Sequence, residues 1–150
     1  MAKPLAPSTA AISDEAWADI VTKIDGLAAM IYRDMFERGF HDKATIVDVN
    51  TPEILALARL ALVGTELSEA AEEVRSGRPF GSVRYENKDG LTSFVQGGEF
   101  QKPVGFTVEL ADAVIRIFDM AGFYALDLGR AIKEKMAYNR SRPYKHGKVA

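Results

Sequence analysis

Apolar residues recur at steps of three and four along most of this chain, which is the spacing that gives a helix one apolar face. The longest such pattern follows Ser13, a favourable N-cap residue, and continues to Gly39. A glycine readily takes the left-handed conformation that closes a helix. We therefore expect a first helix between Ser13 and Gly39, after a flexible proline-containing segment over residues 1–12.

A second helix is predicted from Thr51 to about Arg75. Thr51 supplies a capping hydroxyl, Pro52 suits the first helical position, and Glu53 places an acid in the first turn. Residues 54–63 are apolar nearly all round, so other helices or a second subunit must enclose them. We therefore expect a homodimer or a homotetramer.

The second half of this helix carries one apolar stripe with acidic residues on its flank. The stripe consists of Val63, Leu67, Ala70 and Val74. Because the acidic residues lie beside the stripe, we expect their carboxylates at the edge of the core, where a cleft would form.

Residues 76–105 differ in texture, with six glycines and two prolines, and they are not predicted to be helical. Asp89-Gly90, between residues 83–85 and 92–95, is typical of a β-hairpin turn. The glycines match neither a P-loop nor a dinucleotide-binding loop. We expect this insertion to act as a lid, an oligomer contact or both.

A third helix is predicted over residues 107–124. Its apolar stripe consists of Leu110, Ala111, Val114, Ile117, Phe118 and Ala121. The largely opposite face carries Glu109, Asp112, Arg116 and Asp119. One interpretation is a solvated acidic face with an Asp112–Arg116 pair. The other is a helix packed on two sides, since Val108 and Ile115 flank the same acidic residues.

Asp127 is expected to cap a short fourth helix that ends before Pro143. From Arg130 onward the chain carries seven basic residues and one acidic residue, a local charge of +6 in a chain of net charge −2. This asymmetry, which includes a basic tail over residues 139–150, indicates a polyanionic partner.

The composition bounds the class of protein. A chain of 150 residues, 47% hydrophobic and 27% charged, is typical of one globular domain, which we place at residues 13–150. The absence of cysteine excludes disulfides and thiolate chemistry. We read no signal peptide and no apolar run long enough for a bilayer, so we expect a cytoplasmic protein without a membrane partner.

Two acidic pairs are the candidate chemistry. Glu66 with Glu69, and Glu109 with Asp112, each lie three residues apart, which places both members on one helical face. Facing helices with such pairs would offer several oxygen ligands to a hard cation such as Mg²⁺. Taken singly, each pair is also common on solvated helices. Neither histidine has a second metal-binding residue at the spacing of a metal site. No serine lies in the sharp strand-turn-helix context of a catalytic nucleophile.

Three motifs then occur in order along the chain. They are Glu66-x-x-Glu69, Glu109-x-x-Asp112, and Lys135-x-x-Tyr138-Asn139-x-x-Arg142-Pro143-Tyr144-x-His146-Gly147-Lys148. Together they resemble the MazG-like branch of the all-α nucleoside triphosphate pyrophosphatase superfamily, over roughly residues 51–150. The 39 residues between Glu69 and Glu109 exceed the spacing in most relatives, a departure that bears on substrate choice and assembly.

The resemblance implies a four-helix-bundle-like all-α fold, assembled as dimers or tetramers, that uses Mg²⁺ to hydrolyse nucleoside triphosphates to monophosphate and pyrophosphate. Mn²⁺ is a possible substitute. The implied metal ligands are Glu66, Glu69, Glu109 and Asp112. The cations would neutralise phosphate charge and activate a water for attack on the α-phosphorus.

The same resemblance suggests roles for further residues. Glu69 is our first choice for the base that takes the proton of the attacking water, and Glu73 is a possible auxiliary ligand. The residues expected to contact phosphate or sugar are Lys135, Asn139, Arg142 and Lys148.

Three alternatives stay open. One is phosphoribosyl-ATP pyrophosphohydrolase, which has a similar fold and similar acids. A second is a non-catalytic helical module that binds nucleic acid through its basic tail, although nucleic acid is not the partner we favour. The third is a purely structural bundle.

Overall fold

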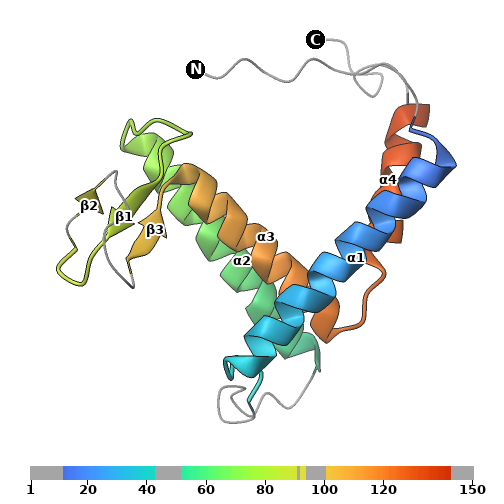
Figure 1. Ribbon diagram of the computed structural model, residues 1–150, viewed down its shortest axis with the longest axis horizontal. Helices are drawn as coiled ribbons and strands as arrows, with labels where there is room; N and C mark the ends of the chain where they lie inside the picture. Colours follow the sequence, from blue (N-terminus) through green and yellow to red (C-terminus); the bar gives the residue numbers. More distant parts are fainter. Residues whose placement is uncertain (1–11, 43–51, 91, 94–100, 143–150) are drawn as a thin grey trace. The chain divides into compact units, whose positions relative to one another are not determined.

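A computed structural model describes residues 12–42, 52–90, 92–93 and 101–142. Within these ranges the chain forms four helices and three short strands (Figure 1). The elements are α1 (Asp14–Glu37), α2 (Pro52–Arg75), β1 (Arg84–Glu86), β2 (Thr92–Ser93), β3 (Lys102–Val104), α3 (Phe106–Phe123) and α4 (Leu128–Ser141). The prediction of a mostly helical protein is confirmed. No helix in the described ranges is long and apolar enough to cross a bilayer.

Contacts between residues divide the chain into two compact units. Unit 1 comprises Met1–Leu27 and Leu126–Ala150, and unit 2 comprises Ala28–Ala125. Helix α1 therefore contributes its first half to unit 1 and its second half to unit 2. The single domain expected over residues 13–150 stays a prediction.

Local sequence signals set the helix ends where the structure describes them. The Ser13 hydroxyl accepts a hydrogen bond from the backbone of Ala16 at 3.2 Å, and Asp127 accepts one from the backbone of Arg130 at 3.1 Å. Gly39 has φ 81 and closes α1, with its N–H bonded to Phe36 O. These caps are confirmed, whereas Thr51 and all but the last residue of the segment 1–12 lie outside the described ranges.

The insertion contains the expected hairpin and one further strand. Strands β1 and β2 pair antiparallel, with Tyr85 opposite Ser93, and Gly90 in the connection has φ 76. Strand β3, which we did not predict, pairs antiparallel with the other edge of β1 and gives the order β2-β1-β3. Figure 1 shows this sheet where α2 ends and α3 begins. The three strands therefore place the insertion next to the acidic segments at the end of α2 and the start of α3.

Helices α2 and α3 run side by side in unit 2 (Figure 1), and each of them buries two acidic residues. On α2 the buried residues are Glu66, Ala70 and Glu73. On α3 they are Glu109, Ala113, Asp119 and Ala121. Small alanines at these positions let the two backbones approach closely, and buried carboxylates of both helices accept hydrogen bonds from arginines or from a histidine.

The structure corrects one prediction about these faces and argues against one of the two interpretations of the other. On α2, Leu67 and Val74 of the expected core stripe are 51% and 43% exposed, while Glu66 and Glu73 beside them are buried. On α3, the face interpreted as solvated contains Glu109, which is only 4% exposed. The physical reason on α2 is that Arg116 and Arg84 pair with Glu66 and Glu73 and make their burial tolerable, which helical periodicity does not reveal.

Unit 1 brings the first half of α1 against α4. The backbone N–H of Gly129 donates to Asp25 Oδ1 at 3.0 Å, and Trp17 is buried at 7% exposure. Lys133 on α4 forms a 3.4 Å ion pair with Asp14, at the start of α1. These contacts connect the N-terminal part of α4 to α1. Helix α4 carries part of the basic C-terminal run.

Candidate functional site

Three of the four predicted metal ligands come together in unit 2. Carboxylate oxygens of Glu66, Glu69 and Glu109 all lie within 4.8 Å of one another. The first two residues share one face of α2, and the third comes from the facing turn of α3. Pairing of the two helices therefore converts an i, i+3 pattern into a cluster of three carboxylates.

Glu109 is the member of this cluster whose environment most calls for a cation. Its side chain is buried, and its Oε2 atom has no hydrogen-bond donor within the described ranges. Burial raises the pKa of Glu109, and the negative charge of Glu69 raises it further. Both effects disfavour the ionised carboxylate until a positive charge compensates it.

Asp112, the fourth predicted ligand, lies beside this cluster. It lines one hollow together with Glu66 and Glu69, although the group of oxygens within 4.8 Å comprises the other three residues. Burial raises the pKa of Asp112, and the charge of Glu66 adds to the shift. As at Glu109, burial and a neighbouring negative charge thus disfavour the ionised form of Asp112.

Arg116 forms an ion pair with one carboxylate of the cluster, that of Glu66. Its Nε and Nη2 atoms both approach Oε1 of Glu66, with the Nε hydrogen bond at 2.6 Å. The expected Asp112–Arg116 pair within α3 is thus replaced by a pair between helices. Both donors converge on one oxygen of Glu66. The positive charge of Lys102 offsets only part of the raised pKa of Glu109.

The residues present fit Mg²⁺ or Mn²⁺. Carboxylate oxygens are the ligands that hard divalent cations prefer, and these cations accept several of them around one centre. A buried carboxylate oxygen without a donor is the feature that a cation would satisfy. We conclude that the cluster is a candidate divalent-cation site.

Glu73 has another role than the auxiliary ligand expected from the sequence. Its carboxylate accepts hydrogen bonds from Arg78 and Arg84, and both of its oxygens lie 2.9 Å from Arg84 Nη2. It does not belong to the group of three close carboxylates. The negative charge of Glu73 is therefore paired with two arginines of the insertion.

Two hollows adjoin the carboxylate cluster and share Glu69 and Lys102. The sheet-side hollow, about 430 Å³, is lined mainly by charged residues, among them Glu109, Arg78 and Arg84. The Phe40 hollow, about 370 Å³, adds the apolar side chains Met35, Phe40 and Ile115 to Glu66 and Asp112. Glu69, which is exposed, stands where a molecule could reach it from either hollow.

Sequence reasoning missed the cationic residues at the cluster. Lys102 lines both hollows, and Arg84 is buried in the wall of one of them. Both belong to the glycine-rich insertion, where no motif or helical spacing marks them. The sequence offered one indication of their position: the insertion connects the two helices that carry the acidic motifs, so its ends must lie near these helices.

The predicted substrate-binding residues lie in the other unit. Lys135 and Asn139 are on α4, and Arg142 is its C-cap residue. Lys135 Nζ lies 5.1 Å from the centroid of the Tyr138 ring, and Arg142 Cζ lies 5.8 Å from it. Lys148 lies outside the described ranges. Their contact with a nucleotide stays a prediction.

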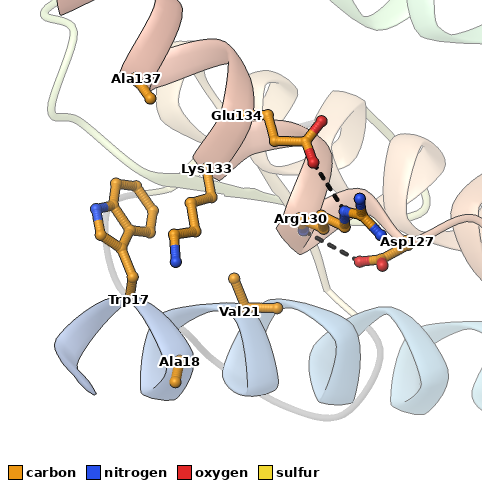
Figure 2. A pocket seen from close by; sticks show the side chains of 8 residues that line it. All are labelled: Trp17, Ala18, Val21, Asp127, Arg130, Lys133, Glu134 and Ala137. Carbon is orange, nitrogen blue, oxygen red and sulfur yellow. Dashed lines mark hydrogen bonds and ion pairs between the residues drawn. The ribbon is translucent and has the colours of Figure 1, made fainter. Parts of the chain in front are cut away.

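Unit 1 contains an apolar groove of about 460 Å³ between the first half of α1 and α4 (Figure 2). Trp17, Ala18 and Val21 form its α1 side. The charged groups at its rim are already paired, since Arg130 bonds to Glu134 at 2.8 Å and Lys133 to Asp14 (Figure 2 shows the first of these). Because the charged side chains that the structure describes in this groove are already paired, the carboxylate cluster is the stronger candidate.

A buried cluster of His41, Arg59 and Asp119 lies elsewhere in unit 2. His41 Nε2 is 2.7 Å from Asp119 Oδ1, and Arg59 bonds to both residues at 2.9 Å. Because arginine only donates, His41 Nδ1 must accept from Arg59 and Nε2 must carry the proton donated to Asp119. The arginine also lies over the Phe123 ring, 4.2 Å from its centroid. We interpret this mutually paired cluster as structural.

Comparison of the chain with models of protein families, with curated proteins and with solved structures finds no match. The activity suggested by the three motifs therefore stays a prediction.

Proposed function

We propose that this protein is a Mg²⁺-dependent nucleoside triphosphate pyrophosphohydrolase of the all-α pyrophosphatase fold. The observation that carries the proposal is the close approach of Glu66, Glu69 and Glu109, one of which has a buried oxygen without a donor. The ordered acidic and basic motifs of the sequence support the same activity. The products would be a nucleoside monophosphate and pyrophosphate.

Each carboxylate then has a defined task. Glu66, Glu69, Glu109 and Asp112 would hold Mg²⁺, or Mn²⁺ in its place. When bound, the cation would neutralise phosphate charge and lower the pKa of a water molecule. Glu69, the exposed member of the cluster, would take the proton of the attacking water, while the hydrogen bond from Arg116 holds the Glu66 carboxylate in position.

The two hollows suit the two parts of a nucleotide. Apolar and aromatic side chains stack on nucleobases, and Met35, Phe40 and Ile115 provide such a surface in the Phe40 hollow. Contacts of Lys135, Asn139, Arg142 and Lys148 with phosphate or sugar are proposed from the sequence motif alone. The exposed position of Glu69 lets a substrate span the carboxylates between the two hollows.

The function is tested by incubating the protein with a panel of canonical triphosphates and Mg²⁺ and identifying the products. Monophosphate and pyrophosphate, in equal amounts and only with a divalent cation, are expected. Cleavage of phosphoribosyl-ATP alone would favour the related pyrophosphohydrolase. Nucleic-acid binding that ignores chelation of Mg²⁺ and weakens steeply with salt, without hydrolysis, would contradict the proposal.

We also propose a homodimer or homotetramer. Ile54, Leu57, Leu60 and Leu62 of α2 are between 47% and 65% exposed, and Val114 of α3 is 46% exposed. A second copy that packs on these apolar stripes would bury them, as a core face requires. Light scattering in dilute solution is expected to give a mass above the 16.4 kDa of one chain. A stable monomer would contradict the assembly.

Metal binding should stabilise the fold. A ligand at 100 times its dissociation constant adds about 2.7 kcal/mol, enough to raise the melting midpoint by several degrees. We expect Mg²⁺ to raise the midpoint saturably and NaCl of equal ionic strength not to do so. Glu109→Gln is expected to gain less from Mg²⁺ than the parent.

The same variant tests the charge strain in the metal-free protein. Because the folded protein raises the pKa of Glu109, ionisation of this group opposes folding at neutral pH. Glu109→Gln should therefore melt above the metal-free parent at about pH 7, and the gap should narrow as the pH falls towards the ordinary carboxyl pKa of about 4. A gap independent of pH, or an equal response of both proteins to Mg²⁺, would contradict the metal site.

A further inference from the structure

The sheet-side hollow contains cationic residues that the proposed metal site does not use. Arg78, Arg84 and Lys102 line it, and all three belong to the insertion between α2 and α3. Glu69 and Glu109 of the carboxylate cluster line the same hollow. The insertion thus places positive charge directly beside the candidate metal ligands.

Arg84 is the most informative of these residues. It is 8% exposed, and its Nη2 atom is bonded to both oxygens of Glu73. Its Nη1 atom is also buried, and it has no acceptor within the described ranges. Arginine presents a planar fork of donors that matches phosphate oxygens, and a buried donor without an acceptor is costly. Half of this fork is held by Glu73, and the other half lacks a partner.

The charges of the hollow determine what can enter it. Five glutamates and three cationic residues line it, so its formal charge is −2. A free anion would be repelled. One bound divalent cation brings the charge to zero, and a second brings it to +2. A phosphate chain is therefore expected to enter only together with the metal.

We propose that Arg84, with Arg78 and Lys102, binds the two distal phosphates of a metal-bound nucleoside triphosphate in the sheet-side hollow. The proposal rests on the proposed function and adds to it the residues that hold the leaving group. The nucleoside would then lie towards the Phe40 hollow, with Glu69 between the two parts. The acidic and basic motifs on the helices assign no role to the insertion. In this proposal, the insertion recognises the number of phosphates in the substrate.

The chemistry of the reaction agrees with this placement. The water oxygen bonds to the α-phosphorus, the bond from that phosphorus to the bridging oxygen of the β-phosphate breaks, and its electron pair leaves with pyrophosphate. The proton of the water passes to Glu69. Negative charge therefore develops on the pyrophosphate as it departs, and cationic donors already positioned around it stabilise that charge.

Binding of the product separates this proposal from the hydrolytic activity itself. Inorganic pyrophosphate and AMP are the probes, each titrated calorimetrically into the protein with saturating Mg²⁺. Arg84→Gln is expected to bind pyrophosphate roughly tenfold to a hundredfold more weakly, because it loses charge-assisted hydrogen bonds. Its affinity for AMP and its gain in melting midpoint with Mg²⁺ alone should match those of the parent.

Arg38→Gln is the matched control. Arg38 pairs with Asp34 at the surface, where its side chain is 65% exposed, and neither residue lines the sheet-side hollow. This variant removes the same charge without touching the hollow, so its pyrophosphate affinity should stay within about twofold of the parent, as expected for a screened surface charge.

Several results would overturn the proposal. Pyrophosphate binding that is unchanged in Arg84→Gln would mean that the arginine serves only to hold Glu73. An equal loss of AMP and pyrophosphate affinity would mean that it supports the whole site. If Arg84→Gln fails to fold, Lys102→Gln at an exposed position decides, since weaker pyrophosphate binding supports the proposal and unchanged binding refutes it. A parent that hydrolyses triphosphates but does not bind pyrophosphate with Mg²⁺ refutes this proposal and leaves the proposed function intact.

Discussion

Glu69→Gln is expected to lower the rate of Mg²⁺-dependent nucleotide hydrolysis by at least about 100-fold, since a metal ion supplies several kcal/mol of transition-state stabilisation and about 1.4 kcal/mol is a factor of ten. Glutamine has nearly the shape of glutamate, but it neither ionises nor takes a proton. Glu69 is also exposed, so the fold should be preserved. Steady-state kinetics measures the loss, and circular dichroism confirms that the helices remain.

Glu53→Gln is the control for this variant. Glu53 lies in the first turn of the same helix and is also exposed, but it does not line either hollow at the carboxylate cluster. It should retain the activity of the parent. Asp112→Asn is expected to lose activity like Glu69→Gln, because Asp112 shares a hollow with Glu66 and Glu69. Full activity in both site variants would remove these carboxylates from the mechanism.

The largest expected effect on stability comes from Asp119→Ala, which should lower the free energy of unfolding by about 3–5 kcal/mol. Asp119 accepts from His41 and from Arg59, and the side chains of these partners are only 2% and 14% exposed. Without the aspartate, the arginine charge stays buried and uncompensated. Such a loss is a large part of the roughly 5–15 kcal/mol by which a domain is stable. Urea unfolding followed by circular dichroism measures it.

An exposed ion pair provides the comparison. Asp34 of α1 pairs with Arg38, directly after the end of this helix, and both side chains are more than half exposed. Asp34→Ala should cost no more than about 0.5 kcal/mol, because water and salt screen such pairs. If the two substitutions destabilised the protein equally, the buried cluster would contribute nothing beyond a surface pair. Such a result would contradict our interpretation of it.

The sequence determined the helices of this protein because their signals are local. Ser13, Asp127 and Gly39 act on backbone groups within a few residues of themselves, and the structure confirms the helix ends that they predicted. The Asp-Gly turn likewise forms within one short segment. Two acidic pairs at helical spacing were also visible, because that spacing alone places both members of a pair on one face.

Which faces are buried depends on contacts between helices that are distant in the sequence. The apolar stripes of α2 and α3 predicted the core, yet four acidic residues of these helices are buried while stripe residues such as Leu67, Val74 and Val114 are exposed. Hydrophobic periodicity shows that two faces differ, but it does not show which neighbour covers each one. Arg116 and Arg84 make the acidic faces compatible with burial, and they come from positions that no local pattern connects to Glu66 or Glu73.

The candidate site shows the same division. The sequence identified Glu66 and Glu69 as a pair, since one helix carries both, but pairing of two helices was needed to bring Glu109 to them. It gave no sign that Lys102 would line both hollows, or that His41 would meet Asp119, 78 residues away. Such contacts depend on where strands and helices dock, which is set by packing over the whole unit, whereas a sequence pattern reports only what neighbouring residues impose on one another.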